Sequence, residues 1–153
     1  MITIFTPTYN RAHTLPRLYE SLQRQIDSDF EWLVINDGST DNTKHLFAQW
    51  KEEDNKFSIE YYETRNGGKQ RAINEALRIA RGKYFFIVDS DDYLLPEATL
   101  FIKKAFDSLP SNESFIGISG IKGGSDGLPL FHNKNKIPQG GYLDANNLER
   151  EKY

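Results

Sequence analysis

Short apolar runs alternate with helical patterns along the chain, and this alternation restricts the fold more than any other feature of the sequence. The spacing of Leu15, Leu18 and Leu22, for example, places apolar side chains on one face of a helix. Similar patterns follow the later runs, and Pro7 is expected to end the first strand. Apolar or alternating runs predict strands over residues 2–6, 32–35, 57–61, 84–88 and 115–119.

The predicted fold class is α/β, with a mostly parallel sheet flanked by helices on both faces. Strands that alternate with helices form parallel sheets, whose two faces are covered by the connecting helices. In such sheets ligands bind outside the carboxyl ends of the strands. We therefore expect the polar turns after residues 6, 35 and 88 to meet at one edge of the sheet and to form a site.

Length and charge exclude several kinds of protein. The chain has 153 residues and a formal net charge of -3, so it offers no basic surface for nucleic acid or anionic membranes. It has no cysteine, which excludes disulfides. No apolar run approaches the roughly 20 residues of a membrane helix, and the N-terminus turns polar too soon for a signal peptide. We expect a cytoplasmic domain, with any contact to the inner face of a membrane made by parts outside this sequence.

Three carboxylates, Asp89, Asp91 and Asp92, follow the apolar run that ends at Val88. Such a cluster at the end of a buried strand needs either a cation or access to water, because like charges repel and are costly to desolvate. In an extended segment Asp89 and Asp91 would point the same way and could bind Mg²⁺ or Mn²⁺ through oxygen. The alternative is a solvated turn in which Asp92 caps the next helix.

Two further turns carry candidate ligand-binding residues. Gly67-Gly68 precedes the third predicted helix, where backbone N–H groups favour an anion, and Lys69 adds a charge suited to phosphate. The alternative is an ordinary surface helix. Asp37 follows the second strand and either accepts a hydrogen bond from a pyrimidine ring N–H or shapes a turn with Gly38.

Taken together, three stretches in order resemble glycosyltransferase family 2, enzymes of the GT-A fold, a Rossmann-like nucleotide-diphospho-sugar transferase fold. They are TPTYNR at the first strand, VINDGSTDNT after the second, and GGKQRAINEALRIARGKYFFIVDSDDYLLPE from Gly67. The resemblance covers about residues 1–120. It implies a nucleotide-sugar-binding core there, with residues 121–153 forming a loop and the start of an acceptor-side region.

The resemblance also implies a role for each matching residue. Pro7, Thr8 and Tyr9 would line the nucleotide base, which Asp37 would contact. Gly68 and Lys69 would lie near the nucleotide or its diphosphate. Asp89 and Asp91 resemble the acidic positions of the DxD motif: Asp91 would bind Mn²⁺ or Mg²⁺, and Asp89, beside Ser90, would face the ribose or the metal shell.

The implied activity is metal-dependent, inverting transfer of a sugar, expected to come from a UDP-sugar, to a glycan or lipid-linked acceptor, as in polysaccharide biosynthesis. Inversion needs a general base. Glu149 and Asp144 are late acids outside the expected motif, so no base is named and the chain is expected to stop after the nucleotide-binding half. The alternatives are a non-catalytic nucleotide-sugar-binding domain and a sugar nucleotidyltransferase, although TPTYNR lacks the glycine-rich turn of the latter.

Overall fold

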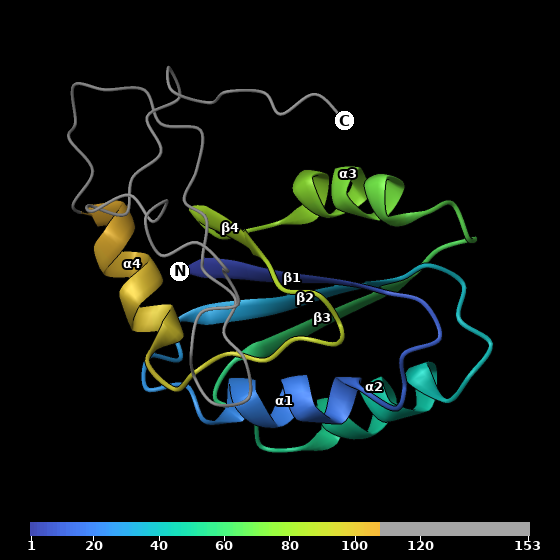
Figure 1. Ribbon diagram of the computed structural model, residues 1–153, viewed down its shortest axis with the longest axis horizontal. Helices are drawn as coiled ribbons and strands as arrows, with labels where there is room; N and C mark the ends of the chain where they lie inside the picture. The colour runs from blue at the N-terminus through green and yellow to red at the C-terminus, as the bar shows by residue number, and fades with distance from the viewer. Residues whose placement is uncertain (108–153) are drawn as a thin grey trace, which may run out of the picture. The chain divides into compact units, whose positions relative to one another are not determined.

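The computed structural model describes residues 1–107, and four parallel strands form the sheet of this region (Figure 1). Residues Met1–Lys103 form one compact unit, and a second unit begins at Lys104. The predicted boundary at residue 120 and the strand over 115–119 lie outside the described residues. The elements are β1 (Ile2–Thr8), α1 (Leu15–Gln23), β2 (Phe30–Asn36), α2 (Thr43–Glu52), β3 (Ser58–Glu63), α3 (Lys69–Ile79), β4 (Tyr84–Ile87) and α4 (Ala98–Asp107).

The strand order is β3-β2-β1-β4, with parallel pairing throughout this sheet. Figure 1 shows α3 on one face and α1 with α2 on the other. The predicted α/β class with helices on both faces is confirmed. In the region that the structure describes, no helix has the length and apolar character needed to cross a membrane.

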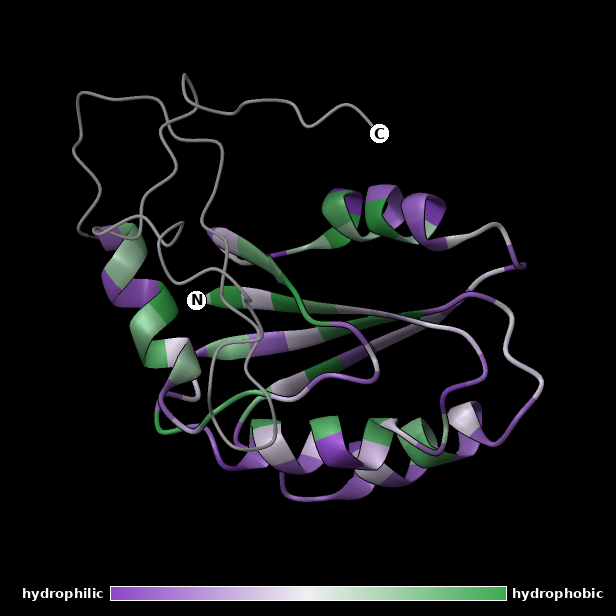
Figure 2. Ribbon diagram, in the orientation of Figure 1, coloured by the Kyte–Doolittle hydropathy of each residue, from purple (hydrophilic) through white to green (hydrophobic). Residues whose placement is uncertain are grey.

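Alternating side chains of the strands supply two separate apolar cores. Ile2 and Ile4 of β1 pack with Leu18 of α1 and with Trp32 and Phe47 on one face. On the other face, Phe5, Leu33 and Ile35 pack against Ala72 and Ala76 of α3. In Figure 2 hydrophobic residues run along β1, whereas the connections at the carboxyl ends of the strands are white to purple. The apolar periodicity therefore fixes the sheet and leaves its carboxyl edge polar.

The sequence predicted that Pro7 ends the first strand, and this prediction is wrong. β1 continues to Thr8, with Pro7 opposite Ile35 of β2. On its other side β1 pairs with β4 only as far as Phe5 opposite Ile87. Beyond Phe5 the strand has a neighbour on one side only, which is where a residue without an N–H is tolerated.

The fourth strand is not fully buried, because β4 is the outer strand of the described sheet. Tyr84, Phe85 and Phe86 are half-buried, and Ile87 is exposed. The helix that follows has its own anchor: Gln25 Oε1 accepts hydrogen bonds from the backbone N–H and hydroxyl of the fully buried Thr99. The segment that follows the three aspartates is thus tied to the end of α1.

Candidate active site at the carboxyl edge of the sheet

Residues from four chain segments line one pocket of about 330 Å³ at the carboxyl ends of the strands. Eight of the nine residues singled out from the sequence lie in its wall, and the ninth, Gly68, immediately precedes Lys69. The sequence argument that the strand-end turns meet at one edge is therefore matched by the geometry. The lining residues are Pro7, Thr8, Tyr9, Arg11, Asp37, Lys69, Ala72, Asp89, Ser90 and Asp91.

Asn10 joins the loop after β1 to the loop after β2. Its backbone N–H donates to Ser39 Oγ at 2.8 Å, and its Oδ1 accepts from the N–H of Thr40 at 2.8 Å. Asn10 has φ 54°, a left-handed conformation that asparagine tolerates better than most residues. Tyr9 and Arg11, on either side of Asn10, are held in the pocket wall by this turn.

Asp41 provides a second connection between the same loops. Its Oδ2 accepts from the N–H of Ala12 at 2.9 Å, and its Oδ1 accepts from both the N–H and the hydroxyl of Thr43 at the start of α2. Burial alone would raise the pKa of the Asp41 carboxyl, but the hydrogen bonds from Thr43 and Ala12 together hold it below its usual range. This charged acceptor thus caps α2 and fixes the loop that carries Arg11.

Asp37 anchors the loop that leads into α3. Its carboxylate is 6% exposed and accepts from the N–H of Gly67 at 2.8 Å and of Gly68 at 2.7 Å. Gly68 has φ +88°, which side chains rarely adopt, so glycine is required there. The two N–H groups that the sequence offered to a ligand anion are therefore already bound to Asp37. Asp37 shapes this distant loop, and not only the turn with Gly38.

Lys69, the first residue of α3, bonds directly to the aspartate segment. Its Nζ lies 2.6 Å from Asp89 Oδ1, and the two side chains are 55% and 33% exposed. The carboxylate cluster was expected to face either a cation or water. In the structure a lysine ammonium partly neutralises it, and Asp91 is exposed to solvent.

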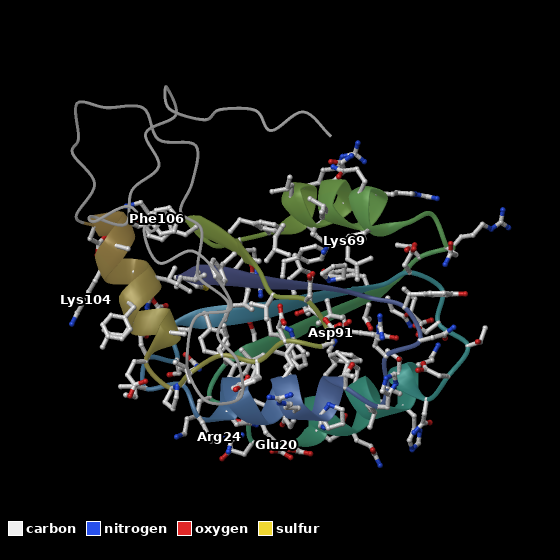
Figure 3. All side chains as sticks on the ribbon, in the orientation of Figure 1. Glu20, Arg24, Lys69, Asp91, Lys104 and Phe106 are labelled. Atoms are coloured by element: carbon white, nitrogen blue, oxygen red, sulfur yellow. The ribbon has the colours of Figure 1, made fainter. Side chains whose placement is uncertain are left out.

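The aspartate segment is a turn and not an extended strand end, so the predicted extended geometry is wrong. The N–H of Asp92 donates to the carbonyl of Asp89 at 3.0 Å, which closes the turn. Ser90 is buried and Asp91 is exposed. Asp89 and Asp91 nevertheless both line the pocket, and Asp92 does not. Figure 3 labels Lys69 at the start of α3 and Asp91 on the segment after β4.

Asp89 and Asp91 fit the needs of a divalent cation that also binds a diphosphate. Within residues 1–107 no group of three or more metal-ligating side chains gathers. Mg²⁺ commonly takes one or two protein carboxylates when phosphates and water complete its shell, so two pocket aspartates are sufficient. The chemistry of the donor set matches a hard cation with oxygen ligands.

Arg11 is the pocket residue that the sequence reasoning missed. It gives the pocket a second cation beside Lys69, against the carboxylates of Asp37, Asp89 and Asp91. No ion pair of its guanidinium is found within residues 1–107. The available signal was a basic residue directly after a polar strand-end turn, in TPTYNR. With three carboxylates against two cations, the pocket carries an excess of one negative charge.

Thr8 and the histidines complete the survey of candidate residues. Thr8 is buried, and its hydroxyl has no hydrogen-bond partner among the residues that the structure describes. His13 and His45 are exposed and lie outside the pocket wall, as expected of surface residues. His132 and the two late acids, Asp144 and Glu149, fall outside the described residues.

The family model for glycosyl transferase family 2 matches residues 3–140 of this chain. The chain belongs to glycosyl transferase family 2. The resemblance stated from the three motifs is therefore confirmed, and the match extends beyond residue 120. The family assignment agrees with the position of the pocket, since every motif that carries the resemblance contributes to its wall.

Known relatives give the same picture. The poly(ribitol-phosphate) beta-N-acetylglucosaminyltransferase TarS of Staphylococcus aureus is 30% identical over 139 residues, which are 90% of this chain and 24% of TarS. The crystal structure of TarS 1-349 in complex with UDP-GlcNAc has a TM-score of 0.61 and 33% identity, covering 69% of this chain and 30% of that one. The chain thus spans about a quarter of the length of TarS.

A second solved structure comes from an archaeal enzyme with a different nucleotide. The mannosyltransferase PcManGT from Pyrobaculum calidifontis, in complex with GDP-Man and Mn²⁺, has a TM-score of 0.65 and 29% identity. The likeness covers 72% of this chain and 33% of that chain. The GT-A fold is shared by these structures and the present chain.

Proposed function

We propose that the carboxyl-edge pocket binds the nucleoside diphosphate of a UDP-sugar, and that this chain supplies the donor site of a glycosyltransferase. The observation that carries the proposal is the convergence of Tyr9, Asp37, Lys69, Asp89 and Asp91 on one pocket in a chain of family 2. The UDP-GlcNAc complex of TarS supports the choice of uridine as the base. The acceptor is a glycan or a lipid-linked hydroxyl compound.

The base is expected against Pro7, Thr8 and Tyr9, at the Asp37 end of the pocket. Asp37 already accepts two backbone hydrogen bonds, yet each carboxylate oxygen has a second lone pair. One of these can accept from the ring N–H of uracil. Asp37 then both fixes the glycine loop and contacts the base. Because the bonds from Gly67 and Gly68 hold its carboxylate, Asp37 keeps the same position with and without nucleotide.

The diphosphate is expected between Lys69, Arg11 and the aspartates. A pocket with one excess negative charge repels a diphosphate, so a divalent cation is needed to invert the sign of the site. Asp91, with Asp89, would hold Mn²⁺ or Mg²⁺, which when bound stabilises negative charge on the leaving diphosphate as a Lewis acid. Lys69 and Arg11 neutralise the remaining phosphate oxygens. Inversion, the sugar and the cytoplasmic location stay predictions, and no general base is assigned.

Calorimetric titration with UDP, GDP and dTDP, each with and without Mn²⁺, tests the proposal. We expect UDP to bind best, and Mn²⁺ to strengthen its binding. Thermal unfolding should agree: ligand specific to the folded state adds RT ln(1 + [L]/Kd), about 2.7 kcal/mol at a hundredfold excess over Kd. Asp91→Asn should abolish the metal-dependent part, whereas Asp92→Asn, outside the pocket wall, should keep it. A parent chain that binds no nucleotide under any of these conditions would refute the proposal.

A further inference from the structure

Lys69 and Asp89, two residues of the donor pocket, form an ion pair with each other. The distance between Lys69 Nζ and Asp89 Oδ1 is 2.6 Å, and both side chains remain partly open to solvent. An ion pair of this kind contributes little to folding, because water solvates both charges and the long lysine side chain loses freedom in forming it. Such a pair can therefore open at small cost.

Both partners have other tasks once a nucleotide arrives. In the proposed function Lys69 faces the diphosphate and Asp89 faces the divalent cation. A lysine ammonium and a divalent cation beside the same carboxylate repel each other strongly at contact distance. The ion pair with Lys69 and coordination of a divalent cation are therefore mutually exclusive at Asp89 Oδ1.

We propose that Lys69 is a resident cation that occupies Asp89 until metal and nucleotide bind, and that it then passes to the diphosphate. The inference rests on the proposed function and adds a mechanism of coupling to it. Without nucleotide, Lys69 competes with Mn²⁺ for Asp89, so the metal alone binds weakly. With nucleotide, the diphosphate offers the ammonium another partner, and Asp89 becomes available. Lys69 thus makes metal and nucleotide bind together.

The fold suits this exchange. Lys69 begins α3, and the backbone before it is fixed by the bonds from Gly67 and Gly68 to Asp37. The helix start therefore stays in place while only the lysine side chain moves. The aspartate turn is also fixed from behind: the Arg17 guanidinium stacks 3.9 Å from the centre of the Tyr93 ring, and the N–H of Leu94 donates to Ser21 Oγ. The start of α3 and the aspartate turn are thus both held in place by other contacts, and the exchange requires only the Lys69 side chain to move.

The test makes two measurements: Mn²⁺ binding without nucleotide, from the loss of the free-ion paramagnetic resonance signal, and UDP binding with saturating Mn²⁺, by calorimetric titration. In Lys69→Met, we expect Mn²⁺ alone to bind about threefold to tenfold tighter, because a competing positive charge is gone. With saturating Mn²⁺, the same variant should bind UDP about tenfold more weakly, because a charged phosphate partner is lost. Opposite signs in the two conditions are the signature of the exchange.

Arg78→Met is the matched control. Arg78 lies on the same helix, nine residues beyond Lys69 and therefore about 13 Å along its axis, and pairs with Glu75 on the surface. The substitution Arg78→Met removes one positive charge so far from Asp89 that salt largely screens its effect there. The affinity for Mn²⁺ alone and the affinity for UDP with Mn²⁺ should both stay within about twofold of the parent. If Lys69→Met does not melt cooperatively, Lys69→Gln replaces it, and the same outcomes decide.

The results separate the two proposals. A parent that binds UDP with Mn²⁺, combined with a Lys69 variant whose affinity for Mn²⁺ alone is unchanged or weaker, overturns the exchange and leaves the proposed function standing. A parent that binds neither UDP nor Mn²⁺ overturns both. Tighter Mn²⁺ binding in Arg78→Met to the same extent would show a general charge effect and would also overturn the exchange.

Discussion

The two ends of the parallel sheet each carry an ion pair next to α3, and the two pairs are built in opposite ways. At the carboxyl edge Lys69 meets Asp89, and both are partly exposed. At the amino edge Glu31 is 1% exposed and accepts from Thr3 Oγ1 at 2.6 Å, from the Arg81 N–H at 2.7 Å and from Arg81 Nε at 2.7 Å. The carboxylate of the first pair is open to solvent and that of the second is buried, whereas both cations, Lys69 and Arg81, are partly exposed.

The amino-edge pair is also part of a larger network. Arg81 Nη2 reaches Glu60 at 2.6 Å, and the N–H of Gly82 donates to Thr3 Oγ1 at 2.8 Å. A side chain at Gly82 would meet the backbone N of Thr3 at 2.3 Å, so glycine lets the chain after α3 lie directly on β1. The contrast teaches that stability and binding are divided between the ends of the same sheet.

The largest expected effect on stability comes from the pair with the buried carboxylate, Glu31–Arg81. Glu31→Ala should lower the free energy of unfolding by about 3 kcal/mol, because it leaves the buried Thr3 hydroxyl and the Arg81 backbone N–H without their acceptor. Urea unfolding measures it. Glu20→Ala, which breaks the exposed pair with Arg24 seen in Figure 3, should change stability by less than about 0.5 kcal/mol. Equal losses in both variants would erase the contrast between buried and exposed pairs.

Acid should act through the same carboxylate. Burial alone would raise the pKa of Glu31, but hydrogen bonds from Thr3 and Arg81 hold it below its usual range. A carboxyl with a lowered folded pKa stabilises the protein fully above its unfolded pKa, about 4.3 for glutamate, and loses that contribution as pH falls through the folded value. Urea midpoints at pH 7 and pH 3 should therefore differ less in Glu31→Gln than in the parent. An unchanged difference would contradict this.

Asp37 should give the next largest effect, and it acts on both stability and binding. The two carboxylate oxygens of Asp37 accept from the Gly67 and Gly68 N–H groups. Asp37→Asn replaces one of these oxygens by an NH₂ group, which cannot accept a hydrogen bond. We expect a loss of about 1–3 kcal/mol in stability and weaker UDP binding. Calorimetry well below the melting temperature separates the two. Full UDP affinity in a destabilised variant would limit Asp37 to a structural role.

Arg11 should affect binding without affecting the fold. Arg11→Gln removes an exposed cation of the pocket, so stability should change by no more than about 0.5 kcal/mol. Affinity for UDP with Mn²⁺ should fall about tenfold, the scale of a hydrogen bond to a charged group. Affinity for uridine, which has no phosphate, should not change. A drop for uridine as well would place Arg11 near the base.

The smallest expected effect completes the comparison. Lys69→Met should change the stability of the ligand-free chain by less than about 1 kcal/mol, since the pair with Asp89 is exposed. Thermal unfolding without nucleotide or metal is the measurement. A loss comparable to that of Glu31→Ala would mean that both ends of the sheet are built for stability, and the exchange at Asp89 would lose its physical basis.

Sequence periodicity was sufficient for the elements and less reliable for their faces. The apolar stripe of α1 was read correctly, because Leu15, Leu18 and Leu22 repeat at helical spacing. On α3 and α4, the apolar residues Leu77 and Phe101 are 55% and 62% exposed. Buried Ala72 and Ala76 and the Gln25–Thr99 bonds set the rotation of these helices instead.

The sequence by itself determined that strand-end turns carry the candidate site, because parallel connections bring the carboxyl ends of strands to one edge. Tertiary structure alone decided which charged and polar groups become partners at the two ends of the sheet. Asp37 meets Gly67 across 30 residues and Lys69 meets Asp89 across 20, while Arg81 reaches Glu31 across 50. A local pattern encodes the period and the ends of an element. It does not encode which distant charge will lie opposite, since that depends on how the elements pack.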